Sequence, residues 1–265
     1  MTSTNEKKID LKQSIDFIRI LIYAAIVGLG AGVLGTLFTF SVNYVTQLRS
    51  NYPWLIYFLP IGGIVIVLLY KLAKYKDAGT DLVINSIHSE PHLPVRIGPL
   101  IFISSVITHL FGGSAGREGA ALQIGGSVGS FVSKIFRLTE EDKKTLIMSG
   151  MSGCFSALFG TPLTAAILPL EVVHVGYMEY AALLPCAIAS LVGHSVAIAM
   201  NLVEPMHHIG TVPNLDAITT LAVIGLSLLA GLVSRLFVFS LHKTHHIFAM
   251  IENAYVRAIV GAVII

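Results

Sequence analysis

Apolar stretches long enough to cross a bilayer recur from about residue 17 to the last residue, so little of the chain remains for a water-soluble domain. Only 12% of the residues are charged, about half the share found in an ordinary soluble domain. The sequence therefore predicts an all-α, polytopic membrane protein with several apolar helices.

Basic residues lie next to the first two apolar segments. Under the positive-inside rule they predict a cytoplasmic N-terminus in the cell membrane and a hairpin made by the first two spans. The stretch from Phe17 is too long for a signal-peptide core and no small-residue cleavage site ends it, so we expect it to remain as a spanning helix. The residues used are Lys7, Lys8, Lys12, Arg19, Arg49, Lys71, Lys74 and Lys76.

The apolar pattern predicts a series of helices, several of which are too short or too broken to span a bilayer alone. Half-length helices are tolerated in a membrane only where their ends are buried in protein or line a polar cavity, so the breaks indicate a binding or permeation site. Long helices are predicted at about 17–49, 53–74, 96–111, 117–136, 140–158, 178–201 and 214–247, with shorter ones at about 80–89 and 161–174.

Local signals fix two helix starts. The segment from Thr139 to Asp142 resembles a capping box, and Pro162 is placed where a first-turn proline fits. Small residues spaced four apart, Gly28 with Gly32 and Gly125 with Gly129, favour close helix packing. Two thiols are expected to be small buried residues rather than a disulfide: Cys154 and Cys186.

An internal repeat is predicted from a constant offset of 199 residues. "AGVLGTLFTFSV" at 31–42 matches "AGLVSRLFVFSL" at 230–241, and "PIGGIVI" at 60–66 faces "IVGAVII" at 259–265. Repeats of this kind are common among transporters, with the site at the repeat interface, and two full repeats would need roughly 400 residues. We expect a cytoplasmic segment at 1–16, a first repeat at 17–212 and an incomplete second repeat at 213–265.

Two adjacent charges, Arg117 and Glu118, lie in the glycine-rich stretch "GGSAGREGAALQIGGSVGS" at 112–130. A carboxylate in mid-bilayer costs roughly 2.5–3.5 kcal/mol, which favours a functional role. The alternative is a simple Arg117–Glu118 pair, but neighbours on a helix do not face each other. At a helix N-terminus, ionised Glu118 could occupy an anion site and leave it when protonated, which gives a direct route to proton-coupled anion exchange.

"GREGAALQIGG" at 116–126 resembles the G-R-E-G-P motif of the CLC family of chloride channels and halide/proton antiporters, with Ala120 where proline is common. "FGTPLTAAILPLEVV" at 159–173 resembles the family's following segment. The resemblance implies an inverted-repeat fold with broken and tilted helices, truncated early in the second repeat. It also implies that Glu118 is the gating and proton-transfer residue. The implied anion-binding residues are Gly79, Thr80, Gly116, Arg117, Gly119 and Ala120, with Arg117 also anchoring its loop by hydrogen bonds to carbonyls.

Departures from the family pattern bear on the anion and on proton transfer. In the proposed anion loop "DAGTD" at 77–81, Ala78 replaces the family's serine, Thr80 its isoleucine and Asp81 its proline. Val172 stands where many antiporters carry an internal proton-transfer glutamate, which resembles the fluoride/proton branch. We interpret Glu171 as structural.

The resemblance further implies halides and protons as partners, no cofactor, no metal, no nucleic acid and no enzymatic activity. It implies a homodimer to which 178–201 contributes. The family's second repeat supplies another anion loop and a tyrosine, so this chain alone is expected to form half a pore.

Three alternatives stay open. A passive chloride channel of voltage-gated type would differ from an exchanger only in its energetics. Gly112 to Gly116 fits G-x-S-x-G, so an intramembrane serine hydrolase could use Ser114 with His109 and His194. Histidines could also bind a metal, although no carboxylate or cysteine completes a site and we expect juxtamembrane polar residues; they are His207, His208, His242, His245 and His246.

Overall fold

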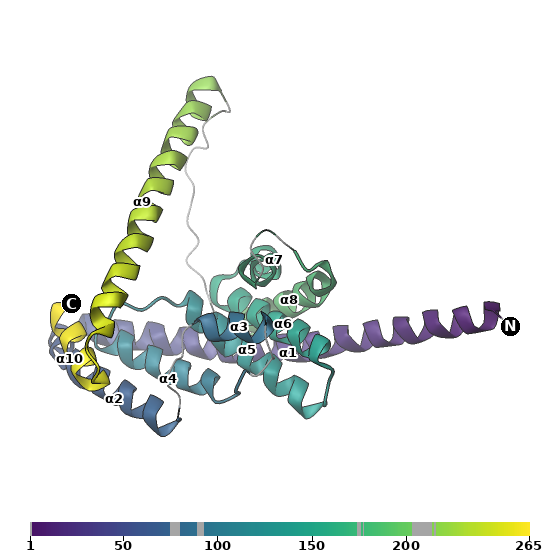
Figure 1. The fold of residues 1–265 in the computed structure, drawn as a ribbon, viewed down its shortest axis with the longest axis horizontal. Coiled ribbons are helices and arrows are strands. Elements are labelled where there is room, and N and C mark those ends of the chain that lie inside the picture. Colours follow the sequence, from purple (N-terminus) through teal and green to yellow (C-terminus); the bar gives the residue numbers. More distant parts are fainter. Residues whose placement is uncertain are drawn as a thin grey trace.

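The computed structural model describes residues 2–74, 80–88, 93–173, 176, 178–202, 214 and 216–265, and the regular structure in these ranges is entirely helical (Figure 1). The all-α prediction is confirmed. The helices are α1 (Thr2–Asn51), η1 (Pro53–Phe58), α2 (Leu59–Leu72), α3 (Thr80–His88), α4 (Ile97–Leu110), α5 (Glu118–Ile135), α6 (Glu140–Phe159), α7 (Pro162–Val173), η2 (Tyr180–Ala182), α8 (Leu183–Ala199), α9 (Ala217–Ala249) and α10 (Ala254–Ile264).

Four helical stretches in the described residues are long and apolar enough to cross a membrane: Ser14–Asn51, Pro53–Leu72, Tyr180–Ala199 and Ala217–Ala249. Ile97–Leu110, Pro162–Val173 and Ala254–Ile264 are apolar but shorter. This mixture of full and partial spans is what the broken apolar pattern predicts.

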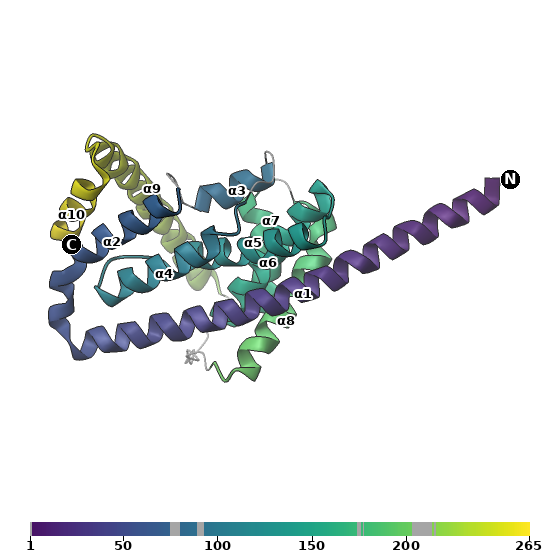
Figure 2. The same ribbon diagram turned by 90° about the horizontal axis from the view of Figure 1, so that it is seen from below.

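The first helix is longer than its apolar stretch. It begins at Thr2 rather than near residue 17, because no glycine or proline interrupts the chain before Gly28 and the intervening Lys, Glu, Gln and Leu residues are good helix formers. Its N-terminal part extends beyond the other helices (Figure 2). Hydropathy therefore marks where the apolar part starts, whereas the helix starts where the backbone permits it.

Helices α1, α6 and α8 converge on glycine contacts, and α5 packs on α6 and also contacts α1. A Cβ on Gly28 would lie 2.5 Å from the Ala189 carbonyl oxygen, and one on Gly32 would lie 2.8 Å from the Gly193 Cα. Gly125 meets the Gly150 carbonyl at the α5–α6 contact, and Gly129 meets Leu146. The packing role predicted for these four glycines is confirmed, and Cys154 and Cys186 are free buried thiols in the same bundle.

The predicted helix starts at α6 and α7 are also confirmed. Thr139 caps α6, since its hydroxyl accepts a hydrogen bond from the Asp142 N–H at 3.2 Å. The helix ends at Gly160, whose φ of 63° is the left-handed conformation that glycine adopts readily. Pro162 then begins α7, so only two residues separate the two helices.

The two sequence segments that are related by the 199-residue offset lie in corresponding helices. Residues 31–42 are part of α1 and residues 230–241 are part of α9, and each helix is followed by a shorter apolar one. Helix α10 packs on α2, where a Cβ on Gly63 would lie 3.2 Å from the Ala258 Cβ. By contrast, α9 extends away from the bundle in Figure 1 and has no buried residue.

Candidate functional site

The end of α4 shapes the loop that leads to the two charged residues. The Gly112 N–H donates to the His109 carbonyl at 3.2 Å, and the Gly113 N–H donates to the Thr108 carbonyl at 2.9 Å. Gly112 has a φ of 80°, so this paired bonding closes the helix as a Schellman motif. Residues 113–117 then run without helix until α5 begins at Glu118.

The N-terminus of α5 carries unbonded backbone donors. Arg117 is its N-cap residue and forms no side-chain cap, and the first i→i−4 bond here runs from the Ala121 N–H to the Arg117 carbonyl at 2.9 Å. The N–H groups of Glu118, Gly119 and Ala120 therefore have no partner among the described residues. Such a helix end attracts anions, because its free N–H groups and the positive end of the helix dipole point the same way.

The Glu118 side chain folds back over this helix end. Its Oε2 lies 2.7 Å from the position that a Cβ on Gly116 would take, so the carboxylate occupies space that any other residue at 116 would fill. Glu118 is exposed. No ion pair joins Arg117 to Glu118 in the part of the chain that the structure describes, which argues against simple pairing as the reason for the two charges.

The residues predicted for the site divide into two groups. Gly116, Arg117, Glu118, Gly119 and Ala120 lie together at the start of α5, and the Ala120 side chain is buried, so it can offer only its backbone there. Gly79 lies outside the described residues. Thr80 is the first residue of α3, which packs on α5 where Val83 meets Gly126.

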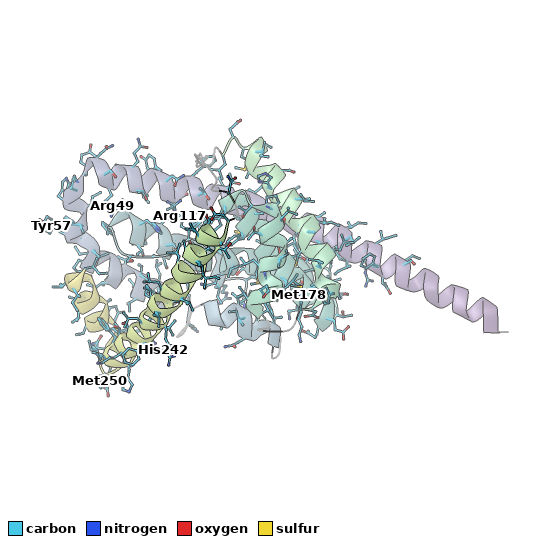
Figure 3. The ribbon with its side chains drawn as sticks, turned by 90° about the horizontal axis from the view of Figure 1, so that it is seen from above. Arg49, Tyr57, Arg117, Met178, His242 and Met250 are labelled. Carbon is cyan, nitrogen blue, oxygen red and sulfur yellow. The ribbon has the colours of Figure 1, made fainter. Side chains whose placement is uncertain are left out.

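Arg117 does not make the predicted hydrogen bonds to carbonyls within the described residues. Its side chain is half-buried, and a different arginine packs on the loop: the Nη1 of Arg49, from the end of α1, lies 2.9 Å from the position of a Cβ on Gly112. In Figure 3, Arg117 lies between Arg49 and the helices of the bundle. Sequence reasoning used Arg49 only for topology, since its contact with the loop joins residues 63 positions apart.

Gln123 is a second residue that sequence reasoning missed. It follows Glu118 by five residues and is 5% exposed, with its Nε2 donating to the Gly119 carbonyl at 3.2 Å. Its Oε1 is buried without a hydrogen-bond partner among the described residues. The sequence signal for Gln123 was a polar amide one turn after the start of a helix whose neighbouring residues are small or apolar.

The hydrolase alternative is wrong. Ser114 lies on an exposed loop after a helix, where a nucleophile elbow requires a strand-to-helix turn. The His109 Nδ1 bonds the Ser105 carbonyl at 2.7 Å, and His194 lies in α8, so neither ring is bonded to Ser114 in the described chain.

The remaining candidates lie outside the 116–120 segment of the sequence. In the described residues no three of the His, Cys, Asp and Glu side chains gather as a metal site would require. The His242 Nδ1 bonds the Val238 carbonyl at 2.9 Å, near the end of α9 (Figure 3), and His207 and His208 lie outside the described residues. Glu171 is exposed near the end of α7, and Val172 beside it is half-buried.

Comparison with known proteins gives a consistent result. A family model described as voltage gated chloride channel matches residues 62–265. The chloride/fluoride channel protein of Pseudomonas syringae pv. tomato is 39% identical over 225 residues, covering 84% of this chain and 50% of that protein. The H(+)/Cl(-) exchange transporter ClcA of Vibrio campbellii is 30% identical, covering 57% of this chain and 36% of that protein.

Two solved structures are also similar. The crystal structure of a CLC-type fluoride/proton antiporter matches with a TM-score of 0.88 and 30% identity, covering 94% of this chain and 64% of that one. A slow cyanobacterial Cl-/H+ antiporter matches with a TM-score of 0.76 at 22% identity, which is a likeness of fold alone. The chain spans about half the length, or less, of the two curated relatives named above.

Proposed function

The chain belongs to the voltage gated chloride channel (CLC) family, and we propose that it transports a halide in exchange for protons, with Glu118 as the gating and proton-transfer residue. The family is one of membrane transport proteins, not of enzymes. Its relatives include proteins named as a chloride/fluoride channel and as a proton/chloride exchanger.

The position of the Glu118 carboxylate carries this proposal. It lies over Gly116 at a helix end whose first three N–H groups are free among the described residues. An ionised carboxylate is itself an anion, so it competes with a halide for these donors and for the dipole of α5. Once protonated, it loses its charge and releases the site, so that each exchange of carboxylate for halide is linked to the movement of a proton.

Fluoride is the halide that we propose. Val172 stands where many antiporters carry a glutamate, which resembles the fluoride branch of the family. The similarity to a fluoride/proton antiporter over 94% of this chain also supports this choice. Chloride is the competing substrate, since the Pseudomonas relative is named for both halides.

The other half of the anion pathway would come from a second repeat. We propose that 213–265 begins this repeat in inverted orientation, because α9 and α10 match α1 and α2 in order and at a fixed sequence offset. The inner anion loop, with Gly79 and Thr80, would complete the site. A second-repeat segment that fails to restore transport when added to this chain would contradict the proposal.

We also infer that two chains pair through α8. Three large apolar residues lie exposed on it at intervals of seven, Leu184, Leu191 and Ile198, and so fall on one face. Light scattering of the purified protein in detergent tests this pairing, and a monomer at all concentrations would overturn it.

Halide efflux from proteoliposomes tests the proposed exchange. Fluoride and chloride electrodes measure the halide released, and an external pH probe measures proton movement. Vesicles with the chain alone are compared with vesicles that hold a version extended through a second repeat. We expect proton-linked fluoride efflux from the extended version. In that version we expect Glu118→Gln to keep halide efflux but lose proton movement, because the amide can neither carry the proton nor compete as an anion.

The matched control is Glu141→Gln, which neutralises an exposed carboxylate in the first turn of α6 and should leave coupling unchanged. Undiminished proton movement in Glu118→Gln would overturn the mechanism. Halide efflux from the unmutated protein without any proton movement would instead identify a passive channel.

A further inference from the structure

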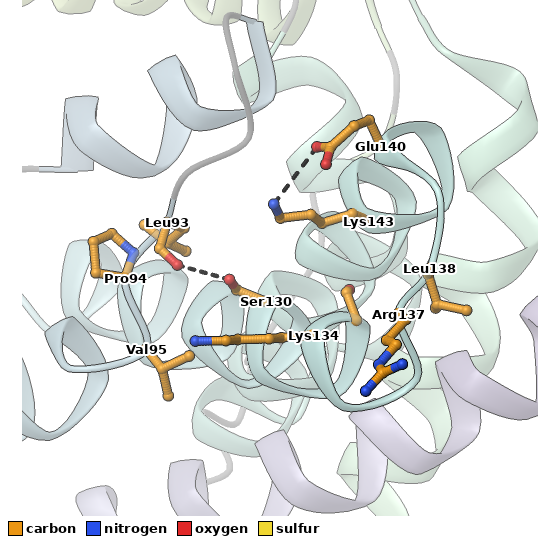
Figure 4. A pocket seen from close by; sticks show the side chains of 10 residues that line it. Leu93, Pro94, Val95, Ser130, Lys134, Arg137, Leu138, Glu140 and Lys143 are labelled. Atoms are coloured by element: carbon orange, nitrogen blue, oxygen red, sulfur yellow. Dashed lines mark hydrogen bonds and ion pairs between the residues drawn. The ribbon is translucent and has the colours of Figure 1, made fainter.

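A cavity of about 350 Å³ lies at the opposite end of α5 from Glu118 (Figure 4). It opens where the end of α5 meets the start of α6 and the segment 93–95. Lys134 follows Glu118 by sixteen residues, which is about 24 Å along the helix axis at 1.5 Å per residue. The cavity is therefore separate from the site described above.

The lining of this cavity is strongly basic. Lys134, Arg137 and Lys143 contribute three cations, and Glu140 is the one acidic side chain among the lining residues. The Lys143 Nζ lies 3.5 Å from a Glu140 carboxylate oxygen. Lys134 and Arg137 form no ion pair within the described chain, so two of the three lining cations are not paired with a carboxylate of the described residues.

Arg137 occupies a backbone position that normally favours glycine. Its φ is 50°, its N–H donates to the Lys134 carbonyl at 3.3 Å, and the Leu138 N–H donates to the Ser133 carbonyl at 3.1 Å. This is the Schellman arrangement, in which a side chain at the left-handed position costs about 1 kcal/mol relative to glycine. Arg137 therefore places a cation at the cavity rim although glycine at this position would make the folded state more stable.

The hydroxyl groups of the cavity are already used as donors. The Ser130 Oγ donates to the Leu93 carbonyl at 2.7 Å, and the Ser133 Oγ donates to the Gly129 carbonyl at 2.6 Å. These bonds hold the two serine side chains in place at the cavity wall. Because both hydroxyl hydrogens are used, the basic side chains are the groups that can bind an anion. Figure 4 shows Lys134 and Lys143 extending from α5 and α6 toward the segment of Leu93, Pro94 and Val95.

The size and the expected location of the cavity indicate the ligand. It is much larger than one halide ion, and several cations around an open space suit a group with several charged oxygens, such as a phosphate. The positive-inside rule assigns the α5–α6 connection to the cytoplasmic side, where basic pockets between membrane helices bind the head groups of anionic lipids.

We infer that this cavity binds a phosphate group, carried by the head group of an anionic phospholipid or by a soluble phosphate ester, with Lys134 and Lys143 as its principal contacts and Arg137 at the rim.

Binding to the purified chain in an uncharged detergent tests this inference. The probes, titrated by calorimetry, are dioctanoyl phosphatidylglycerol, inorganic phosphate and dioctanoyl phosphatidylcholine, which has the same acyl chains but no net charge. We expect phosphatidylglycerol to bind more tightly than phosphatidylcholine and Lys134→Gln to weaken it about fivefold, from the roughly 1 kcal/mol that one basic residue contributes near a membrane surface.

Two matched pairs of variants separate the cavity from general charge. Lys144→Gln removes a cation beside Lys143 that does not line the cavity, and it should bind like the unmutated chain. Arg137→Gly suits the left-handed backbone, so weaker binding in it cannot be ascribed to unfolding. Its control is Lys74→Gly, since Lys74 has a φ of 56° but lies outside the cavity.

Each outcome decides the question without reference to transport. Binding of phosphatidylglycerol but not of inorganic phosphate identifies a lipid head-group site, whereas comparable binding of both identifies a site for soluble phosphate. Equal affinity for phosphatidylglycerol and phosphatidylcholine, no binding of any probe, or equal losses in Lys134→Gln and Lys144→Gln would overturn the inference.

Discussion

Glu118 and Glu140 each begin a helix, but the two helix ends differ. At α6 the Thr139 hydroxyl accepts the Asp142 N–H, so one backbone donor is already satisfied. At α5 the N-cap residue is Arg117, whose side chain can only donate and therefore cannot cap the free N–H groups. The Glu118 side chain is thus an acceptor close to its own helix end, and a transported anion would compete with it.

Asp216 gives a residue-scale prediction with a defined pH dependence. Its Oδ1 accepts the Thr219 N–H at 2.6 Å at the start of α9, and this hydrogen bond holds the pKa of the carboxyl below its usual value. Because the folded pKa is depressed, its contribution to α9 is complete above the unfolded value of about 3.9 and is lost as the pH falls through the lower, folded value.

Hydrogen exchange measured by mass spectrometry checks this at the start of α9. We expect Asp216→Ala to speed exchange at Thr219 and Thr220 at neutral pH, and we expect the difference from the unmutated chain to shrink as the pH falls below the unfolded pKa of about 3.9 and through the lower, folded pKa. A difference that persists undiminished as Asp216 becomes protonated would contradict the assignment.

At this scale, the sequence allowed the helix start at Glu118 to be predicted, because glycines and an apolar periodicity surround it locally. The Arg49–Gly112 contact could not be predicted, since it depends on how α1 meets the loop after α4. The anchoring role expected for Arg117 stays a prediction, because within the described residues it makes no hydrogen bond to a carbonyl, and a side chain's partners are set by elements distant in sequence.

Individual helices pack here through close backbone contacts. The predicted pairs of glycines identified which faces approach closely, but they did not identify the partners. Gly125 and Gly150 meet across the α5–α6 contact, and Gly193 meets Gly153 where α8 crosses α6. Spacing within one helix reveals a small-residue face, whereas the facing helix depends on the whole arrangement.

Gly150→Ala should destabilise the protein. The added Cβ would overlap the Gly125 carbonyl oxygen, a backbone atom that cannot move aside as a flexible side chain can, so we expect a loss of about 1–3 kcal/mol in the free energy of unfolding. Gly231→Ala in α9 is the control, since no heavy atom from another element of the described chain lies within 4 Å of its new Cβ. It should be neutral or stabilising by up to about 1 kcal/mol.

Thermal unfolding in detergent measures both changes. Equal shifts of the midpoint for the two variants would show that the α5–α6 contact is looser than the structure indicates.

The molecule as a whole combines one packed bundle with a helix that lacks comparable contacts. A Cβ on Gly32 of α1 would contact α8, whereas one on Gly231, its counterpart at the fixed offset, would meet no atom of another described element within 4 Å. This difference is what a second repeat would remove by covering α9 as α6 and α8 cover α1. The sequence repeat predicts the correspondence of α1 with α9, but only the structure reveals how unequal their surroundings are.

Our central claim is that the Glu118 carboxylate occupies the position of the transported anion, and halide binding measured by calorimetry at different pH values tests it most directly. At neutral pH, Glu118→Gln should bind fluoride about tenfold more tightly than the unmutated protein, and the two affinities should converge as acid protonates Glu118. Equal affinities at neutral pH, or tighter binding by the unmutated protein, would contradict the claim.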